Sequence, residues 1–222
     1  MTLKLFELEG RDGLRYSLFS WRSRLALAHK GLKAELVPVK LHEKERIAFS
    51  GGRTVPILCD GERVVRDSWA IACYLDERNP DAASLFGGGI GRGLTRSFAD
   101  WVDRAIVPQV VSHLAVDGLA RVHDDDRAYF RSSMEKAFGA TLEHLAEDRE
   151  RWVDGFRKTL APLRRTLRDQ PFVAGEQSAY ADFVLYSVFR WAEVMSAFAL
   201  LAPDDEVLRG WSGRIADLAG RA

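Results

Sequence analysis

Residues 15–32 read RYSLFSWRSRLALAHKGL and place two serines, Ser17 and Ser20, at the start of an expected helix. Thiol redox proteins carry Cys-x-x-Cys at a helix start of this kind, and both cysteine positions are serine here. Apolar residues then recur at spacings of three and four, as in an amphipathic helix that ends near Gly31, namely Leu18, Trp21, Leu25, Ala28 and Leu32. The stretch therefore predicts a helix N-terminus that offers hydroxyl groups and no thiol.

Composition and charge are those of an ordinary globular protein. The chain has 222 residues, of which 47% are hydrophobic and 29% charged, enough for one large domain or two small ones. Basic and acidic residues number 32 each, so no excess of positive charge favours nucleic acid or an anionic membrane as a partner. No apolar run is long enough for a signal sequence or a membrane span, and we expect a cytoplasmic protein.

Cysteine and histidine spacing predicts neither a disulfide framework nor a metal site. Cys59 and Cys73 form no Cys-x-x-Cys, and we expect both to be small buried hydrophobic residues. The histidines have no metal-ligand spacing with each other or with the cysteines; they are His29, His42, His113, His123 and His144.

Two short segments near the N-terminus have strand patterns. Leu3 and Leu5 alternate with Thr2 and Lys4, which is the period of a strand with one face in a core. Residues 34–41, AELVPVKL, predict a second strand parallel to the first. Pro38 lacks the amide hydrogen that a central strand needs, so we place this strand at the sheet edge.

A hairpin and a helix are predicted next. Residues 54–67, TVPILCDGERVVRD, contain two apolar runs, and Asp60-Gly61 between them is expected to supply the positive φ angles of a tight turn. The following helical pattern stops before Pro80. The order βαβ-ββα has the outline of an α/β thioredoxin-like domain, which we place at residues 1–82.

The remaining sequence has long helical patterns and no convincing strand. We expect an all-α C-terminal domain over residues 93–222, joined by a glycine-rich linker over residues 83–92. The glycines of SLFGGGIGRG do not form a phosphate loop, because no Lys-Ser or Lys-Thr follows and no apolar strand leads into them.

Two dipeptides of the first domain have both a structural and a functional interpretation. Val55-Pro56 is a tolerated strand start, but a cis proline would expose the backbone of Val55 to an extended peptide. Asp67-Ser68 is a plain helix cap, but it also offers a carboxylate for an ammonium group and a hydroxyl for a carboxylate. A free α-amino acid end presents that pair of groups.

Ser17 has a structural role as a helix N-cap that is compatible with binding an anion. Lowering a thiol pKa from about 8.5 by two units requires roughly 2.7 kcal/mol. A hydrogen bond to a charged group contributes about 1.5–3 kcal/mol, and a helix terminus about 0.3–1. The site can therefore hold the thiolate of a bound molecule.

These motifs, in this order, resemble soluble glutathione transferases over nearly the whole chain. Within that superfamily the sequences SLFSWRSRLALAHKGL, FSGGRTVPIL, VVRDSWAIACYLDERNPDAASLFGG and QPFVAGEQSAYADF resemble the serine-type branch of bacterial lignin β-etherases and related fungal transferases. The resemblance implies glutathione as cosubstrate and a homodimer that pairs the N-terminal domain of one chain with the helical domain of the other.

The resemblance also implies residue roles. Ser17 stabilises the glutathione thiolate, Val55 pairs with the cysteinyl backbone ahead of cis-Pro56, and Asp67 and Ser68 hold the γ-glutamyl end. The glycyl carboxylate needs a cation, for which Lys40, His42 and Arg53 are unranked candidates. Phe19, Trp21 and Trp101 are candidates for the wall of the electrophile pocket, although Trp101 also fits a core position.

Three positions depart from the family pattern. Leu18 replaces the usual proline and Phe19 the usual tyrosine of the branch motif Ser-Pro-Tyr-x-Trp-Arg. Ala179 replaces the capping residue that precedes Asp182, so half of the late capping box is missing and we expect a weaker folding role for Asp182.

We expect a glutathione transferase-like enzyme that activates the glutathione thiolate for attack on an electrophile, such as an aryl ether. The alternative is a non-catalytic binding protein of the same fold for hydrophobic ligands or a protein partner. Ser17 favours the enzyme, and the changed residues Leu18 and Phe19 keep the alternative open. A thiol oxidoreductase is disfavoured by the missing cysteine.

Overall fold

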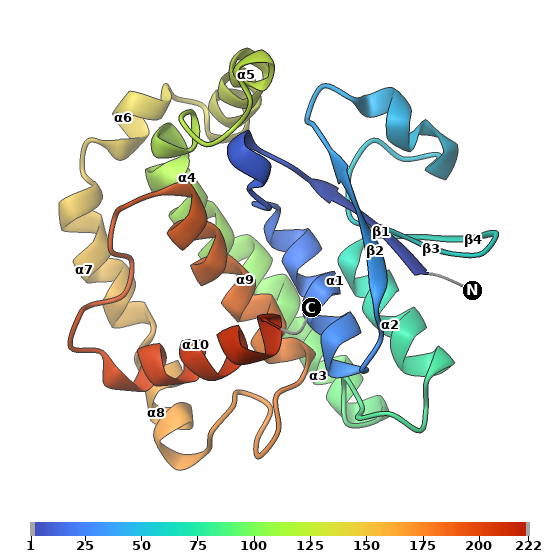
Figure 1. Cartoon of the computed structure of the whole chain (residues 1–222). Coiled ribbons are helices and arrows are strands. Elements are labelled where there is room, and N and C mark those ends of the chain that lie inside the picture. Colours follow the sequence, from blue (N-terminus) through green and yellow to red (C-terminus); the bar gives the residue numbers. More distant parts are fainter. Residues whose placement is uncertain (1–2, 221–222) are drawn as a thin grey trace.

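The computed structural model describes residues 3–220 and has an α/β part followed by a helical part. Figure 1 shows the sheet on one side of the molecule, the later helices on the other, and α1 (Leu18–His29) between them. Thr2 of the expected first strand and the outermost residues of both expected domains lie outside the described residues. Within residues 3–220 no helix is both long and apolar enough to cross a membrane.

The sheet has the strand order β2-β1-β3-β4 and confirms the predicted strands. The strand bounds are Leu3–Leu8 for β1, Ala34–Val39 for β2, Ile57–Asp60 for β3 and Arg63–Arg66 for β4. β1 runs parallel to β2 and antiparallel to β3, so Leu5 is paired with Leu36 on one side and Leu58 on the other. β2 lies at an edge, as Pro38 predicts.

The hairpin between β3 and β4 differs by one residue from the predicted turn. Gly61 has a φ of 60°, as a tight turn requires, and its partner in the two-residue loop is Glu62. Asp60 stays in β3 and pairs with Arg63, so it does not supply a positive φ.

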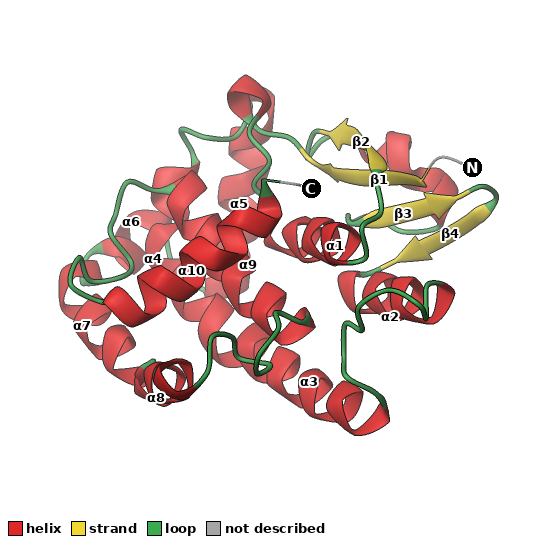
Figure 2. Cartoon of the chain, turned by 60° about the horizontal axis from the view of Figure 1, so that its bottom comes forward, coloured by secondary structure: helices red, strands yellow, loops and turns green. Residues whose placement is uncertain are grey.

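Two helices lie side by side on one face of the sheet (Figure 2), α1 and α2 (Ser68–Arg78). α1 ends as its sequence predicts, because Gly31 adopts a φ of 67° and lets the Leu32 amide donate to the Leu27 carbonyl at 2.9 Å. α2 ends at Arg78, before Pro80.

The segment between the two parts is more ordered than a flexible linker. Leu85 and Phe86 are buried, and the Leu85 backbone is hydrogen-bonded on both sides, to Asp76 at 2.8 Å and to the Tyr180 amide at 3.0 Å. The next helix, α3, already begins at Gly89, so part of the expected linker is helical. Burial of two large apolar side chains explains why the glycine-rich sequence is held in place.

The helical part follows the predicted all-α pattern. Its helices are α3 (Gly89–Trp101), α4 (Val107–Gly118), α5 (Arg127–Phe138), α6 (Leu142–Ala146), α7 (Arg149–Thr159), α8 (Ala161–Asp169), α9 (Tyr180–Met195) and α10 (Glu206–Ala219). A π-helical segment, Val102–Ile106, joins α3 to α4. α9 is buried over most of its length and packs against α1, which couples the two parts of the molecule (Figure 1).

Asp182 on α9 accepts more hydrogen bonds than its half capping box predicts. Its carboxylate is fully buried and accepts hydrogen bonds from the backbone amides of Val173 (2.7 Å), Ala174 (3.3 Å) and Ala179 (3.1 Å) and from the Trp211 indole (2.8 Å). The Ala179 side chain has no acceptor for the Asp182 amide, which donates instead to the Ala179 carbonyl at 2.9 Å. Half of the capping box is missing, as expected, and the Asp182 carboxylate nevertheless accepts four hydrogen bonds.

We expect Asp182→Ala to lower the free energy of unfolding by about 3 kcal/mol, because it leaves buried donors without an acceptor. The denaturation midpoint in urea measures the change. Asp169→Ala, at an exposed position, is the control and should stay within about 0.5 kcal/mol of the wild type. Equal effects of the two substitutions would contradict a special role of Asp182.

Candidate active site

One cavity of about 980 Å³ collects most of the residues that the sequence singles out. It extends from the start of α1, past the end of β2, to the start of α2. The predicted site residues that line it are Ser17, Phe19, Lys40, Arg53, Val55, Pro56, Asp67 and Ser68. His42, Trp21 and Trp101 are outside the lining.

Ser17 and Ser20 differ in their surroundings although both lie at the mouth of α1. Ser17 is the N-cap, and its hydroxyl oxygen accepts a hydrogen bond of 3.2 Å from the Ser20 amide. The Ser17 hydroxyl hydrogen remains available to donate, because a hydroxyl accepts and donates at once. The Ser20 hydroxyl is buried and has no hydrogen-bond partner within the described residues.

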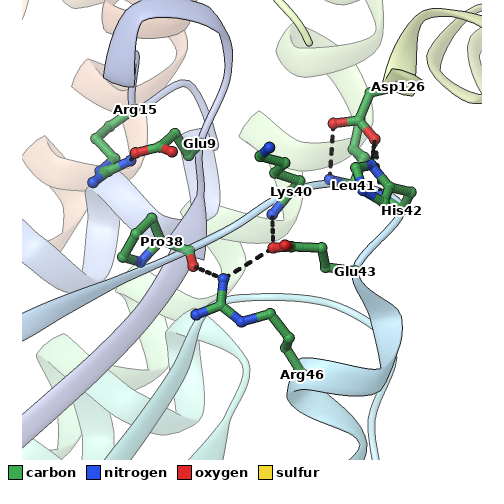
Figure 3. A network of polar contacts seen from close by, with 9 residues as sticks. All are labelled: Glu9, Arg15, Pro38, Lys40, Leu41, His42, Glu43, Arg46 and Asp126. Carbon is green, nitrogen blue, oxygen red and sulfur yellow. Dashed lines mark hydrogen bonds and ion pairs between the residues drawn. The ribbon is translucent and has the colours of Figure 1, made fainter. Parts of the chain in front are cut away.

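The loop that leads into Ser17 is held by Trp21 and Arg15. The Trp21 indole N–H donates to the Arg15 carbonyl at 3.0 Å. The Arg15 guanidinium pairs with Glu7 at 2.9 Å. It also pairs with Glu9, as Figure 3 shows. Burial raises the pKa of Glu7, and the nearby positive charges of Arg24 and Arg15 partly oppose that shift. The contacts of Trp21 and Arg15 thus hold the loop that precedes Ser17 and so fix the position of its hydroxyl.

Val55 presents free backbone groups to the cavity. The Val55-Pro56 peptide bond is cis, and Pro56 is buried while Val55 is only partly so. Among residues 3–220, neither the amide nor the carbonyl of Val55 has a hydrogen-bond partner. A ligand with an extended backbone could satisfy both groups.

Asp67 combines the structural and the functional interpretations of its dipeptide. Its Oδ1 caps α2 by accepting from the amides of Trp69 (2.9 Å) and Ala70 (3.1 Å). Its Oδ2 has no hydrogen-bond partner in the described part of the chain. Asp67 adopts a φ of 75°, which aspartate tolerates better than most residues. Ser68, the first residue of α2, is buried beside it.

The three candidate cations are not equivalent. Lys40 and Arg53 line the cavity. His42 instead contacts the helical part, because its Nδ1 lies 2.7 Å from the Asp126 carboxylate. Lys40 and Arg53 are therefore better placed than His42 to meet an anion in the cavity.

Of the aromatic residues expected to line the cavity, only Phe19 is in the lining. Phe19 lines it, is 39% exposed and lies with its ring 4.7 Å from the Arg22 guanidinium. Leu8, Leu41 and Met134 are also among the apolar residues of the lining, and no sequence motif marks them. Lys44, also in the lining, lies 5.4 Å from the Tyr129 ring.

Both candidate tryptophans have other surroundings. Trp21 is buried, with Arg24 at 4.5 Å and Arg190 at 5.2 Å from its ring, so cations and not a cavity flank it. Trp101 is 43% exposed at the end of α3 and packs beside Phe98 at a ring distance of 5.6 Å. The structure does not bring either ring into the lining with Ser17.

Within the described residues, no group of three or more histidine, cysteine, aspartate or glutamate side chains could hold a metal ion. The polar groups of the cavity are instead hydroxyls, backbone amides, cations and one carboxylate. Such groups suit a zwitterionic, peptide-like ligand.

Comparison with known proteins agrees with the fold and the motifs. Residues 16–78 match the N-terminal domain of glutathione S-transferases, and residues 93–213 match their C-terminal domain. A zeta-class glutathione S-transferase of Euphorbia esula is 32% identical over 160 residues, which cover 67% of this chain and 70% of that protein.

Solved structures of fungal glutathione transferases have the same fold. One from Phanerochaete chrysosporium superposes with a TM-score of 0.87 at 20% identity, covering 98% of this chain and 97% of that one. One from Ceriporiopsis subvermispora, solved in complex with glutathione, has a TM-score of 0.83 at 20% identity and covers 100% of this chain and 98% of that one. Both domain matches together show that the chain belongs to the glutathione S-transferase family.

Proposed function

We propose that this protein is an enzyme that binds glutathione in the cavity and activates its thiol for attack on an electrophile. The observation that carries the proposal is that one cavity is lined by the acidic and hydroxyl pair at α2, the free backbone of Val55, Ser17 and the cations Lys40 and Arg53. Glutathione presents matching groups, because it is a tripeptide with an α-amino acid end, a central thiol and a terminal carboxylate.

The γ-glutamyl end of glutathione fits the start of α2. The second carboxylate oxygen of Asp67 can accept a hydrogen bond from the α-ammonium group, because its first oxygen already caps the helix. The Ser68 hydroxyl and the helix N-terminus favour the α-carboxylate. Two neighbouring residues, Asp67 and Ser68, thereby bind the two charged groups of the γ-glutamyl end.

The rest of the tripeptide lies across the cavity in this proposal. The cysteinyl amide and carbonyl pair with the free carbonyl and amide of Val55, as in strand addition. Lys40 or Arg53 holds the glycyl carboxylate. His42 is disfavoured in this role because Asp126 already engages its ring.

The thiolate is held at the N-terminus of α1. The Ser17 hydroxyl accepts from the Ser20 amide and donates its hydrogen to the sulfur, so a fixed hydroxyl faces the negative charge. This hydrogen bond and the helix dipole together contribute about 2–4 kcal/mol, enough to lower the thiol pKa by about two units. A useful fraction of bound glutathione is then ionised at neutral pH.

The electrophile is an aromatic molecule, for which an aryl ether is our specific proposal. The similarity of the α1 motif to the serine-type branch and the apolar wall of Leu8, Phe19 and Met134 support it. In the reaction the thiolate attacks the carbon that bears the ether oxygen. The carbon–sulfur bond forms, the carbon–oxygen bond breaks, and the phenolate leaves with the electron pair and takes a proton from water.

The non-catalytic alternative is less well supported. A protein that only binds hydrophobic ligands has no need for a capping hydroxyl with a free hydrogen in the same cavity as an unpaired carboxylate oxygen. Ser17 and Asp67 provide both groups, so the enzyme is the better interpretation.

We also propose that the protein is a homodimer. Large apolar side chains are exposed along α3, with Ile90 at 85%, Leu94 at 69% and Trp101 at 43%. Their spacing places them on one side of the helix, next to the half-buried Phe98. A second copy of the chain would cover this apolar surface.

We expect Ser17→Ala to raise the pKa of bound glutathione by about one to two units, because it removes a hydrogen bond to the thiolate. Ser20→Ala should shift the pKa little, since the Ser20 hydroxyl is buried and points at no partner among the described residues. Titration of the thiolate absorbance in the ultraviolet measures both values. A larger pKa shift for Ser20→Ala than for Ser17→Ala would show that Ser17 is not the hydroxyl that binds the thiolate.

The same variants separate binding from folding. Ser17→Ala should cost about 1 kcal/mol of stability through the lost cap, and Ser20→Ala should cost less, because it removes no hydrogen bond. If neither variant changes the thiolate pKa while Ser17→Ala lowers stability, Ser17 is only a cap.

We expect phenol release from a model aryl ether only in the presence of glutathione, with one equivalent of thioether formed. Phe19→Ala should lower kcat/KM for this substrate about tenfold, because the ring loses apolar contact. Phe49→Ala is the matched control, since Phe49 is 55% exposed and outside the cavity lining. If the protein conjugates glutathione to halogenated aromatics but releases no phenol from the aryl ether, it is a glutathione transferase and the etherase proposal fails.

A further inference from the structure

A carboxylate from the helical part enters the loop that follows β2. Asp126, directly before α5, is fully buried. Its carboxylate accepts hydrogen bonds from the amides of Leu41 at 3.1 Å and His42 at 2.9 Å, and it lies 2.7 Å from Nδ1 of His42. Figure 3 shows this single side chain facing three nitrogen atoms of a segment that is more than 80 positions away in the sequence.

The loop is braced internally on its other side. The Lys40 amide donates to the Glu43 carboxylate at 3.0 Å. Arg46 pairs with Glu43 at 2.9 Å and donates to the Pro38 carbonyl at 2.8 Å (Figure 3). Glu43, from inside the loop, thus holds the amide of Lys40 itself. Asp126, from the helical part, holds the amides of the two residues that follow Lys40.

These contacts fix the backbone on both sides of the Lys40 side chain. Glu43 holds the Lys40 amide, and Asp126 holds the next two amides along the chain. Hydrogen bonds to a charged acceptor are about twice as strong as neutral ones, so the loop has little freedom here. The Lys40 side chain itself extends away from Glu43 (Figure 3) and lines the cavity.

We propose that Asp126 is a positioning residue for substrate binding: it holds the loop after β2 so that Lys40 meets the glycyl carboxylate of glutathione. The inference rests on the proposed function, because it takes glutathione as the ligand of the cavity. It makes the glutathione site dependent on a residue of the helical domain, although the groups that contact the tripeptide all come from the first domain.

Asp126 also connects two segments that line the cavity. α5 begins at the residue after Asp126 and contributes Met134 to the apolar wall, while Leu41 lines the same cavity from the loop. The contact between Asp126 and the Leu41 amide therefore links the start of α5 to the loop after β2, and both segments contribute to the cavity lining. A change at Asp126 should affect glutathione binding first, because Lys40 is the cation of the lining that directly precedes the two amides held by Asp126.

We expect Asp126→Asn to raise KM for glutathione about tenfold while kcat at saturating glutathione stays within about twofold, the signature of lost ground-state binding. The amide keeps at most one acceptor for two backbone amides and turns a donor toward one of them. A thermal melt reports whether the variant is folded. Asp125→Asn is the matched control, because Asp125 is exposed and forms no hydrogen bond or ion pair within the described range; its KM should match the wild type.

A double-mutant cycle with Lys40→Met separates positioning from general stability. If Asp126 acts through Lys40, each single variant raises KM about tenfold and the double variant raises it no further. Additive effects, of about a hundredfold in the double variant, would overturn the proposal, as would an unchanged KM in folded Asp126→Asn.

Isothermal titration of the wild type with glutathione separates this proposal from the proposed function. Absence of binding to the wild type would refute the glutathione site itself. Binding to the wild type with equal affinities for Asp126→Asn and Asp125→Asn would refute the role of Asp126 alone. For a variant that melts too low to titrate, Asp126→Glu, which keeps the charge, should recover part of the glutathione affinity; no recovery in a folded Asp126→Glu would count against positioning.

Discussion

The arrangement of the two parts of this protein depends on one buried cation, Arg22 of α1. Its guanidinium is 2% exposed, donates to both carboxylate oxygens of Asp103 at 2.6 and 3.1 Å, and bonds Ser187 on α9 at 3.1 Å. Removing the Asp103 carboxylate leaves the buried Arg22 charge without its ion partner, which costs about 3 kcal/mol, at the low end for buried pairs because Asp103 is 32% exposed. Ser17 lies five positions before Arg22, so the interaction that joins the domains also fixes the proposed catalytic hydroxyl.

The partner of Arg22 lies in the irregular part of the helix that crosses the molecule. Asp103 belongs to the π-helical segment Val102–Ile106, which is followed by Pro108 in α4. Proline cannot donate to the carbonyl four residues earlier, so regular α-helix is interrupted here and a wider turn can form. The π-helical segment carries Asp103, whose carboxylate pairs with Arg22 of α1. The irregular helix is therefore part of the contact between the domains.

Local sequence patterns predicted the fold well, but they could not predict contacts between residues that are distant in the sequence. The strand alternation of Leu3 and Leu5, the edge position of Pro38 and the end of α1 at Gly31 depend on neighbours in the chain, and the structure has all three. The hydrogen bonds of Asp126 and Asp182 join residues that are far apart in sequence, so no spacing reveals them. For that reason His42 looked equivalent to Lys40, and three of the four hydrogen bonds to the Asp182 carboxylate were not anticipated.

The candidate site uses atoms that helix capping leaves over. Ser17 and Asp67 cap α1 and α2, and each is held in place by the amides it satisfies. Capping occupies only one acceptor direction of each side chain, so the Ser17 hydrogen and the second Asp67 oxygen remain for a ligand. Both N-termini also carry partial positive charge, which suits a thiolate at one and a carboxylate at the other. A hydroxyl can therefore replace the cysteine of a redox protein at this position without loss of the cap, and the thiol then comes from the bound substrate.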